Sequence, residues 1–309
     1  MYKFRKGVCE MRYISKLFLI LTIVFGLAFS STTFTHAVQT DEMLDEPIVV
    51  YGDTLSDAQK EEVRRLLDVD PGKVTEMNVT GQDIAHYING DPNSRMFSSV
   101  KITQKDKGHG IVVNIVTADN ITQVTSEMYS NALLTAGVEH ALIEVASPVQ
   151  VTGTSALSGI YKAYDAAGAE LEKGRMEVAN EELDLTTELS EKEGLSQETV
   201  TELMTEIKKA IADQNPATRE DVEQIVQEQL ENLEVNLSEE DRQLLIDLFE
   251  KMRNLDIDFD QVKQQLEDIT STIKDKLDDM NLELDEGFWD KVSKFFQDLI
   301  DSIANLFKG

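Results

Sequence analysis

The sequence predicts an α+β protein, in which an N-terminal mixed-sheet α/β domain is followed by an acidic all-helical C-terminal domain. Up to residue 173, short alternating apolar runs are separated by helical stretches. From residue 174 onward the apolar residues recur at three-and-four spacing, which is typical of helices. The net charge of −29 over 309 residues is concentrated in this second half. The segment 142–171 joins the two patterns, because its strand-like start runs through Pro148 and Gly153 into a small-residue helix.

Residues 1–37 have the order of residues typical of a secretory signal. Five basic residues precede the uncharged run 17–29, and small residues lead to Ala37. The apolar run is shorter than the roughly 20 residues of a permanent membrane-spanning helix. We therefore expect a signal peptide cleaved after Ala37 and a location that is extracellular or associated with the cell envelope. An uncleaved N-terminal anchor is the alternative.

Composition excludes several classes of function. The single cysteine, Cys9, lies within the signal segment, so the exported chain has no disulfide, thiol nucleophile or thiolate metal site. The large negative charge repels the phosphate backbone of nucleic acids, so we expect no nucleic-acid partner.

The α/β domain is expected at 47–173, after a polar linker at 38–46. The segments expected as strands either alternate apolar with polar residues or are short apolar runs. Ser56 and Gln59 form a capping box at the start of the first helix. The strand, helix and strand from residue 110 to 145 predict a right-handed parallel crossover. A charged, glycine-containing turn predicts that the third and fourth strands form a hairpin. The expected strands are 47–51, 74–79, 96–103, 110–117 and 141–145, and the expected helices are 56–69, 82–88 and 120–136.

The acidic helical domain is expected at 174–286. Helices begin at Ser196, Thr218 and Ser238, each of which can cap a helix, and Asn215–Pro216 ends the first of the three. A fourth stripe runs from Val262 to Met280. Such stripes bury one face and leave a charged face in water, which predicts an antiparallel bundle or a helical hairpin array.

Several separated motifs in the first half resemble those of the YpuA-like family. They include Ser98–Val100, Asn131–Val138, Ala146–Val149 and Val151–Ile160, and a looser similarity extends to Gly287–Trp289. Members of this family are exported proteins of Gram-positive bacteria built on a domain of unknown function. The resemblance implies an exported, envelope-associated protein, and it implies no catalytic residues.

The turn Thr152–Gly153–Thr154–Ser155 is the candidate ligand-binding site. It precedes a helix, so backbone N–H groups and three hydroxyls converge where a carboxylate or phosphate can bind. Alternatively, Thr154 or Ser155 only caps the helix. A serine nucleophile at Ser155 is a further hypothesis, but Leu157 replaces the glycine that a nucleophile elbow requires.

Metal sites are predicted to be absent, although two patterns were considered. His140 and Glu144 would face the same side of a strand, but no third zinc ligand accompanies them. His86 and His109 lie elsewhere in the sequence, away from this pair. Asp256, Asp258, Asp260 and Glu267 match the spacing of a calcium loop, but Gln261 stands where glycine is needed, and the helical stripe runs through the pattern. Capping of that helix by Asp258 or Asp260 is the simpler interpretation.

Residues 287–309 form a strongly amphipathic segment. Its aromatic face includes Phe288, Trp289, Phe295 and Phe296, which predicts contact with a membrane surface or a protein partner. Closure of the helical bundle by this segment is the alternative.

The sequence therefore predicts a non-enzymatic binding or structural module of the cell envelope, whose partner is an envelope protein or a wall polymer. No cofactor is expected. A secreted hydrolase acting through Thr152–Ser155 and an acidic calcium-binding protein are the alternatives.

Overall fold

The computed structural model describes residues 46–169, 171–192, 195–255, 257, 263 and 265–273 of the chain. The strands in these ranges are β1 (Ile48–Gly52), β2 (Thr75–Val79), β3 (Ser99–Gln104), β4 (Ile111–Ile115) and β5 (Ala141–Ala146). The labelled helices are α2 (Asp57–Leu66), α3 (Gly81–Ile88), α4 (Ser126–Ala136), α5 (Ala156–Ala166), α6 (Lys173–Ser190), α7 (Gln197–Gln214), α8 (Arg219–Asn232) and α9 (Glu239–Arg253). A further helical stretch, 265–273, follows α9.

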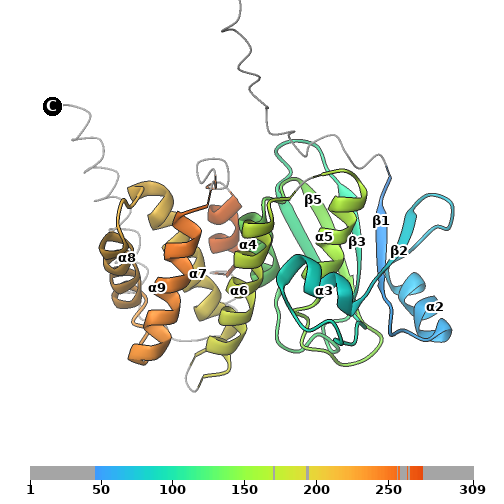
Figure 1. Cartoon of the computed structure of the whole chain (residues 1–309), viewed down its shortest axis with the longest axis horizontal. Coiled ribbons are helices and arrows are strands. Elements are labelled where there is room, and N and C mark those ends of the chain that lie inside the picture. Colours follow the sequence, from blue (N-terminus) through green and yellow to red (C-terminus); the bar gives the residue numbers. More distant parts are fainter. Residues whose placement is uncertain are drawn as a thin grey trace, which may run out of the picture. The chain divides into compact units, whose positions relative to one another are not determined.

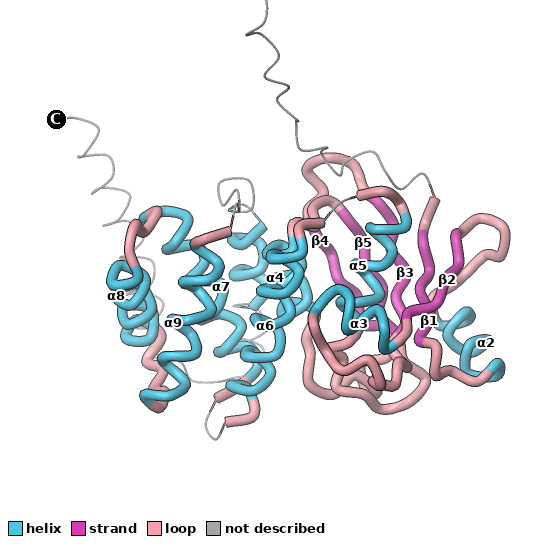
Figure 2. The backbone as a smooth tube through the Cα atoms, in the orientation of Figure 1, coloured by secondary structure: helices cyan, strands magenta, loops and turns pink. Residues whose placement is uncertain are grey.

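The five described strands form one mixed sheet, as predicted, and their order in it is β2-β1-β3-β5-β4 (Figure 1 and Figure 2). β1 pairs with β2, and β4 with β5, in parallel, whereas β3 pairs antiparallel with both β1 and β5. The expected parallel relation of β4 and β5 across α4 is thus confirmed.

The predicted hairpin between the third and fourth strands is wrong. β3 pairs with β5, and β4 lies on the far side of β5, at the edge of the sheet. The loop between them is fastened to the start of β5 instead, where the N–H of Lys105 donates to the carbonyl of His140. A charged turn indicates only that the chain reverses, and the apolar β5, which pairs along both of its edges, takes the place between the two strands.

Both faces of the sheet carry apolar side chains. On one face Val50, Val100 and Ile143 pack with α3, α4 and α5 in the main core. On the other face Val49 and Tyr51 pack with α2 in a smaller cluster. Figure 2 shows α2 beside β1 and β2, while α4 lies beside the β4 end of the sheet.

Helix α6 links this core to the helical region. Met176, Ala179 and Leu183 belong to the main core, whereas Leu185 and Leu189 on the same helix pack with α7, α8 and α9. The helical C-terminal region is therefore confirmed, and it is packed against α4 and α6 rather than joined by a free linker.

The expected helix caps are present. The side chains of Ser56, Ser196, Thr218 and Ser238 each accept an N–H from the first turn of their helix. Asn215 ends α7 in the left-handed conformation.

The prediction that each stripe leaves a charged face in water fails for α7. Every residue from Val200 to Ile211 is buried, including Glu202, Glu206, Lys208 and Lys209. The reason is its central position, because α4, α6 and α8 all pack against it. Among the described helices, none combines the length and the apolar character that crossing a membrane requires.

Candidate functional site: a groove beside the edge strand

The predicted ligand turn Thr152–Ser155 lies between β5 and α5, with Thr152 exposed and Gly153 buried. Gly153 has a φ of +108°, and its carbonyl accepts the Tyr129 hydroxyl at 2.6 Å. A Cβ at this position would lie 2.7 Å from Cγ2 of Ile121 and 2.9 Å from the Tyr129 hydroxyl. The glycine is thus required by the packing of the turn against α4 and the loop before it.

The expectation that Thr154 or Ser155 caps α5 is wrong. Ser155 occupies the cap position with φ −68° and ψ −10°, and its side chain makes no capping hydrogen bond. A capping side chain needs an extended backbone at that residue, whereas Ser155 is already helical. Among the described residues no base is hydrogen-bonded to the Ser155 hydroxyl. Ligand binding by Thr152, Gly153, Thr154 and Ser155 stays a prediction.

The candidate metal residues do not come together where the structure describes them. Glu144 pairs with Lys101, at 3.1 Å between carboxylate and ammonium, and not with His140. Nδ1 of His140 accepts the N–H of Gly110 at 3.1 Å. His86 and His109 are exposed. The described part of the chain holds no group of three or more His, Cys, Asp or Glu residues placed to bind a metal.

Other predicted residues lie wholly or partly outside the described ranges. Of the calcium-loop pattern only Glu267 is described, and it is exposed on the helical stretch 265–273. Leu266 and Ile269 are buried on that stretch, as the helical interpretation of the stripe predicts. Asp256, Asp258 and Asp260 lie outside the described residues, as do the signal segment 1–37 and the contact residues Phe288, Trp289, Phe295 and Phe296.

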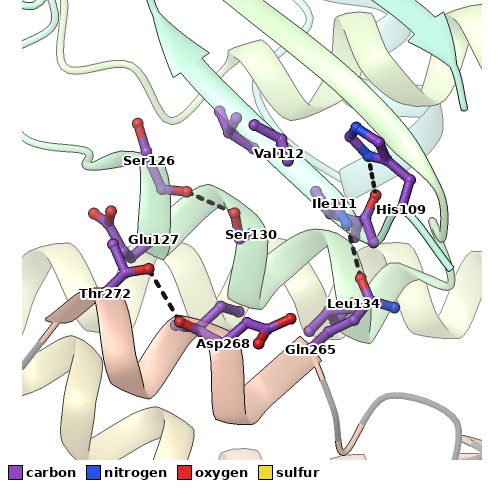
Figure 3. A pocket seen from close by; sticks show the side chains of 13 residues that line it. His109, Ile111, Val112, Ser126, Glu127, Ser130, Leu134, Gln265, Asp268 and Thr272 are labelled. Carbon is purple, nitrogen blue, oxygen red and sulfur yellow. Dashed lines mark hydrogen bonds between the residues drawn. The ribbon is translucent and has the colours of Figure 1, made fainter.

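A groove of about 250 Å³ that the sequence did not predict lies between β4, the first half of α4 and the stretch 265–273 (Figure 3). Ser126 and Ser130 line it from α4, and Asp268 and Thr272 line it from the second helix. The remaining lining residues are His109, Gly110, Ile111, Val112, Val113, Glu127, Leu134, Gln265 and Ile269.

The backbone of β4 faces this groove with its outer edge. The carbonyl of Gly110 accepts a hydrogen bond from β5, and the N–H of Val116 donates one to it. The backbone N–H and C=O groups of even-numbered β4 residues therefore point toward β5, and those of odd-numbered residues point to the outer edge of the sheet. The outward N–H of Ile111 donates to Oε1 of Gln265 at 2.8 Å. Within the described ranges no group pairs with the outward N–H or C=O of Val113 or Ile115. In the described part of the chain β4 therefore presents an open sheet edge.

The groove is apolar along the strand and acidic on the helices. Val112, on the open face of β4, is 44% exposed, one of two large exposed apolar side chains described. Glu127 and Asp268 contribute carboxylates, and the described residues that line the groove include no Lys or Arg. Asp268 is exposed and forms no ion pair with any described residue. An extended chain of opposite charge is the ligand that such a surface complements.

A buried charged network supports the helical wall of the groove. Lys208 of α7 donates to the carboxylate of Glu182 on α6 at 2.5 Å and to the carbonyl of Asn131 on α4 at 2.8 Å. Thr135 donates to the same carboxylate at 2.6 Å. Burial lowers the pKa of Lys208, although the Glu182 charge acts in the opposite direction. These bonds fix α4 relative to α6 and α7.

A second buried ion pair, between Glu206 and Lys209 of α7, contacts the groove helix. Thr270 donates to Oε1 of Glu206 at 3.0 Å, and Lys209 donates to that carboxylate at 3.0 Å. Next to Thr270 on the same helix, Leu266, Ile269 and Ile273 pack with Leu134 of α4. The stretch 265–273 is thus anchored on both α7 and α4.

Comparison with known proteins identifies the family but no activity. The model of a family described as a protein of unknown function, DUF1002, matches residues 51–269. The chain is also 37% identical over 205 residues to the uncharacterized protein YpuA of Bacillus subtilis (strain 168). That alignment covers 64% of this chain and 69% of YpuA. No solved structure matches.

The YpuA-like resemblance read from the motifs is thereby confirmed. The matched range begins in β1 and ends within the stretch 265–273, so it contains every described lining residue of the groove except Thr272. The chain belongs to the DUF1002 family of proteins of unknown function.

Proposed function

We propose that this chain is an exported module of the cell envelope that works by binding a partner. Export is supported by the order of residues in 1–37, with a basic start, an uncharged run and a small-residue end. The observation that carries the binding role is the edge of β4, where the outward backbone groups of Val113 face a groove and pair with none of the described residues.

The partner is an envelope protein in preference to a wall polymer. An exposed strand edge offers alternating N–H and C=O groups at the spacing of a peptide backbone, which a polypeptide matches residue by residue. Contact of Phe288, Trp289, Phe295 and Phe296 with a membrane surface or a partner is a second part of the proposal.

Fractionation of cells that express the full chain with a C-terminal tag tests export. We expect the tagged chain in the envelope or medium fraction, with Val38 as its first residue. A matched variant with Leu21→Arg and Val24→Asp interrupts the apolar run and should keep the chain inside the cell. Recovery of the uncleaved wild-type chain in the cytosol would refute the proposal.

Retention at the envelope is tested separately with Phe295→Ser and Phe296→Ser. If the aromatic face makes the contact, the double variant shifts from the envelope fraction to the medium. An unchanged distribution would remove this segment from the proposal.

The hydrolase alternative predicts that Ser155→Ala abolishes any hydrolysis of wall fragments that the wild-type chain shows.

A further inference from the structure

We infer that the groove binds an extended segment of another protein that is rich in Lys or Arg, and that this segment adds to β4 as a sixth strand. The inference rests on the proposed role as a binding module and names the chemistry of the partner. It is carried by two independent features of the groove, namely the direction of the β4 backbone groups and the charge of the helical wall.

The backbone groups fix where the added strand begins. Gln265 already satisfies the N–H of Ile111, at 2.8 Å, so the first available outward donor is that of Val113. The next outward residue is Ile115, one two-residue repeat or about 6.6 Å further along the strand. An extended segment that pairs with these groups therefore runs along the second half of β4, and Gln265 defines its end.

The charges determine the kind of segment. Asp268 and Glu127 line the groove, and no Lys or Arg occurs among the described residues of its lining. Asp268 is exposed and has no ion-pair partner among the described residues. A Lys or Arg of the bound segment can therefore pair with the Asp268 carboxylate without displacing another described cation.

A second copy of the chain fits the same edge poorly. Pairing of two β4 edges would bring together two chains that each carry a net charge of −29, and it would place two Asp268 side chains near one interface. Like charges at an interface disfavour association. A basic segment meets an attractive field at the same edge.

The test measures hydrogen exchange at individual β4 amides of the full exported chain with three synthetic decapeptides. The first alternates Lys with Thr and Val, the second has Glu at each Lys position, and the third is the Lys peptide with N-methyl groups on alternate residues. We expect the first peptide to slow exchange at Val113 and Ile115 by at least about 10-fold. Val112 and Asn114 already donate to β5 and serve as internal controls, with little change.

A matched pair of variants tests the charge. Asp268→Lys reverses the groove carboxylate, whereas Glu267→Lys reverses its exposed neighbour, which does not line the groove. We expect the first variant to bind the Lys peptide about 5-fold more weakly or worse, in line with the loss of an exposed ion pair, and the second to bind within about 2-fold of wild type. Binding is measured by fluorescence anisotropy at low salt.

Four outcomes would overturn the inference. Equal binding of the Glu peptide would refute the charge preference, and equal binding of the N-methylated peptide would refute strand addition. Protection of Val113 that depends on protein concentration without peptide would indicate self-pairing. If no peptide slows exchange at Val113 or Ile115, the proposed site is refuted. If the chain is nevertheless retained in the envelope in the fractionation experiment, the proposed function still stands.

Discussion

The buried pair of Glu182 and Lys208 supports the most quantitative prediction. Both side chains are almost fully buried, with 1% and 3% of their surfaces exposed, and 2.5 Å separates the carboxylate from the ammonium. Replacing Glu182 by Met keeps most of the volume but leaves the ammonium of Lys208 with the Asn131 carbonyl as its remaining described acceptor. The perturbation therefore isolates one buried charge.

The expected loss in the free energy of unfolding at pH 7 is about 3–5 kcal/mol, which is typical when one member of a buried ion pair is removed. This is a large fraction of the roughly 5–15 kcal/mol that stabilises a folded domain. Replacing Lys208 by Met as well removes the stranded charge. The double variant should lose only about 1–2 kcal/mol, mainly because Thr135 and Asn131 lose their hydrogen bonds.

The assay is urea unfolding of the wild type, Glu182→Met, Lys208→Met and the double variant. Raising the pH provides a further check on Glu182→Met. Burial already lowers the pKa of Lys208 below its usual 10.5, and loss of Glu182 lowers it further. A lysine with a depressed folded-state pKa destabilises the fold at low pH, and this penalty is relieved as the pH rises toward 10.5.

The variant should therefore recover part of its stability between pH 7 and pH 10, relative to wild type. A double variant that loses as much as the two single variants together would show that the two residues do not interact, and the reasoning from the buried pair would fail.

Three further predictions concern local structure. Burial alone would raise the pKa of Asp83, but hydrogen bonds from Lys162 and Thr80 outweigh burial and hold the pKa below 3.8. The stabilisation of the fold by the ionised Asp83 is therefore present above pH 3.8 and is lost as the pH falls further. Lys162→Met should accordingly lower the urea midpoint at pH 7, and its difference from wild type should narrow as the pH falls below 3.8, whereas a constant difference would contradict this. Gly153→Ala should lower stability by at least about 2 kcal/mol in thermal unfolding, because of its positive φ and the contact with Ile121, and a neutral effect would show that the turn adapts. Thr218→Ala should lower stability by about 1 kcal/mol through loss of the capping box, and Thr218→Ser should restore most of it.

Features that depend on neighbouring residues in the chain were predicted well. Ser56, Ser196, Thr218 and Ser238 cap their helices as expected, because a capping bond spans only three residues. Asn215 ends α7 for a similarly local reason. The mixed sheet and the helical second half also follow from the periodicity of apolar residues.

The candidate site was not predicted, because its parts come together only in the folded chain. The run Ile111–Ile115 is recognisable as a strand, but its composition does not show that it lies at the edge of the sheet. The wall formed by Gln265 and Asp268 is separated from β4 by more than 150 positions in sequence. The signal that could have pointed to this wall was the apolar stripe around Leu266, which indicated a helix but not the element that it packs against.

The sequence by itself determined the capped helix starts, the strand-forming segments, the family and the acidic character of the chain, since each depends on residue identity over short distances, although the helix expected at 120–136 begins only at Ser126. The tertiary structure alone decided that β5 separates β3 from β4, that Lys208 is buried in the middle of α7, and that the outer edge of β4 lies beside Asp268 with no further strand among the described residues. These outcomes depend on which surfaces compete for burial once α4, α6 and α7 pack together, and local periodicity carries no information about that competition.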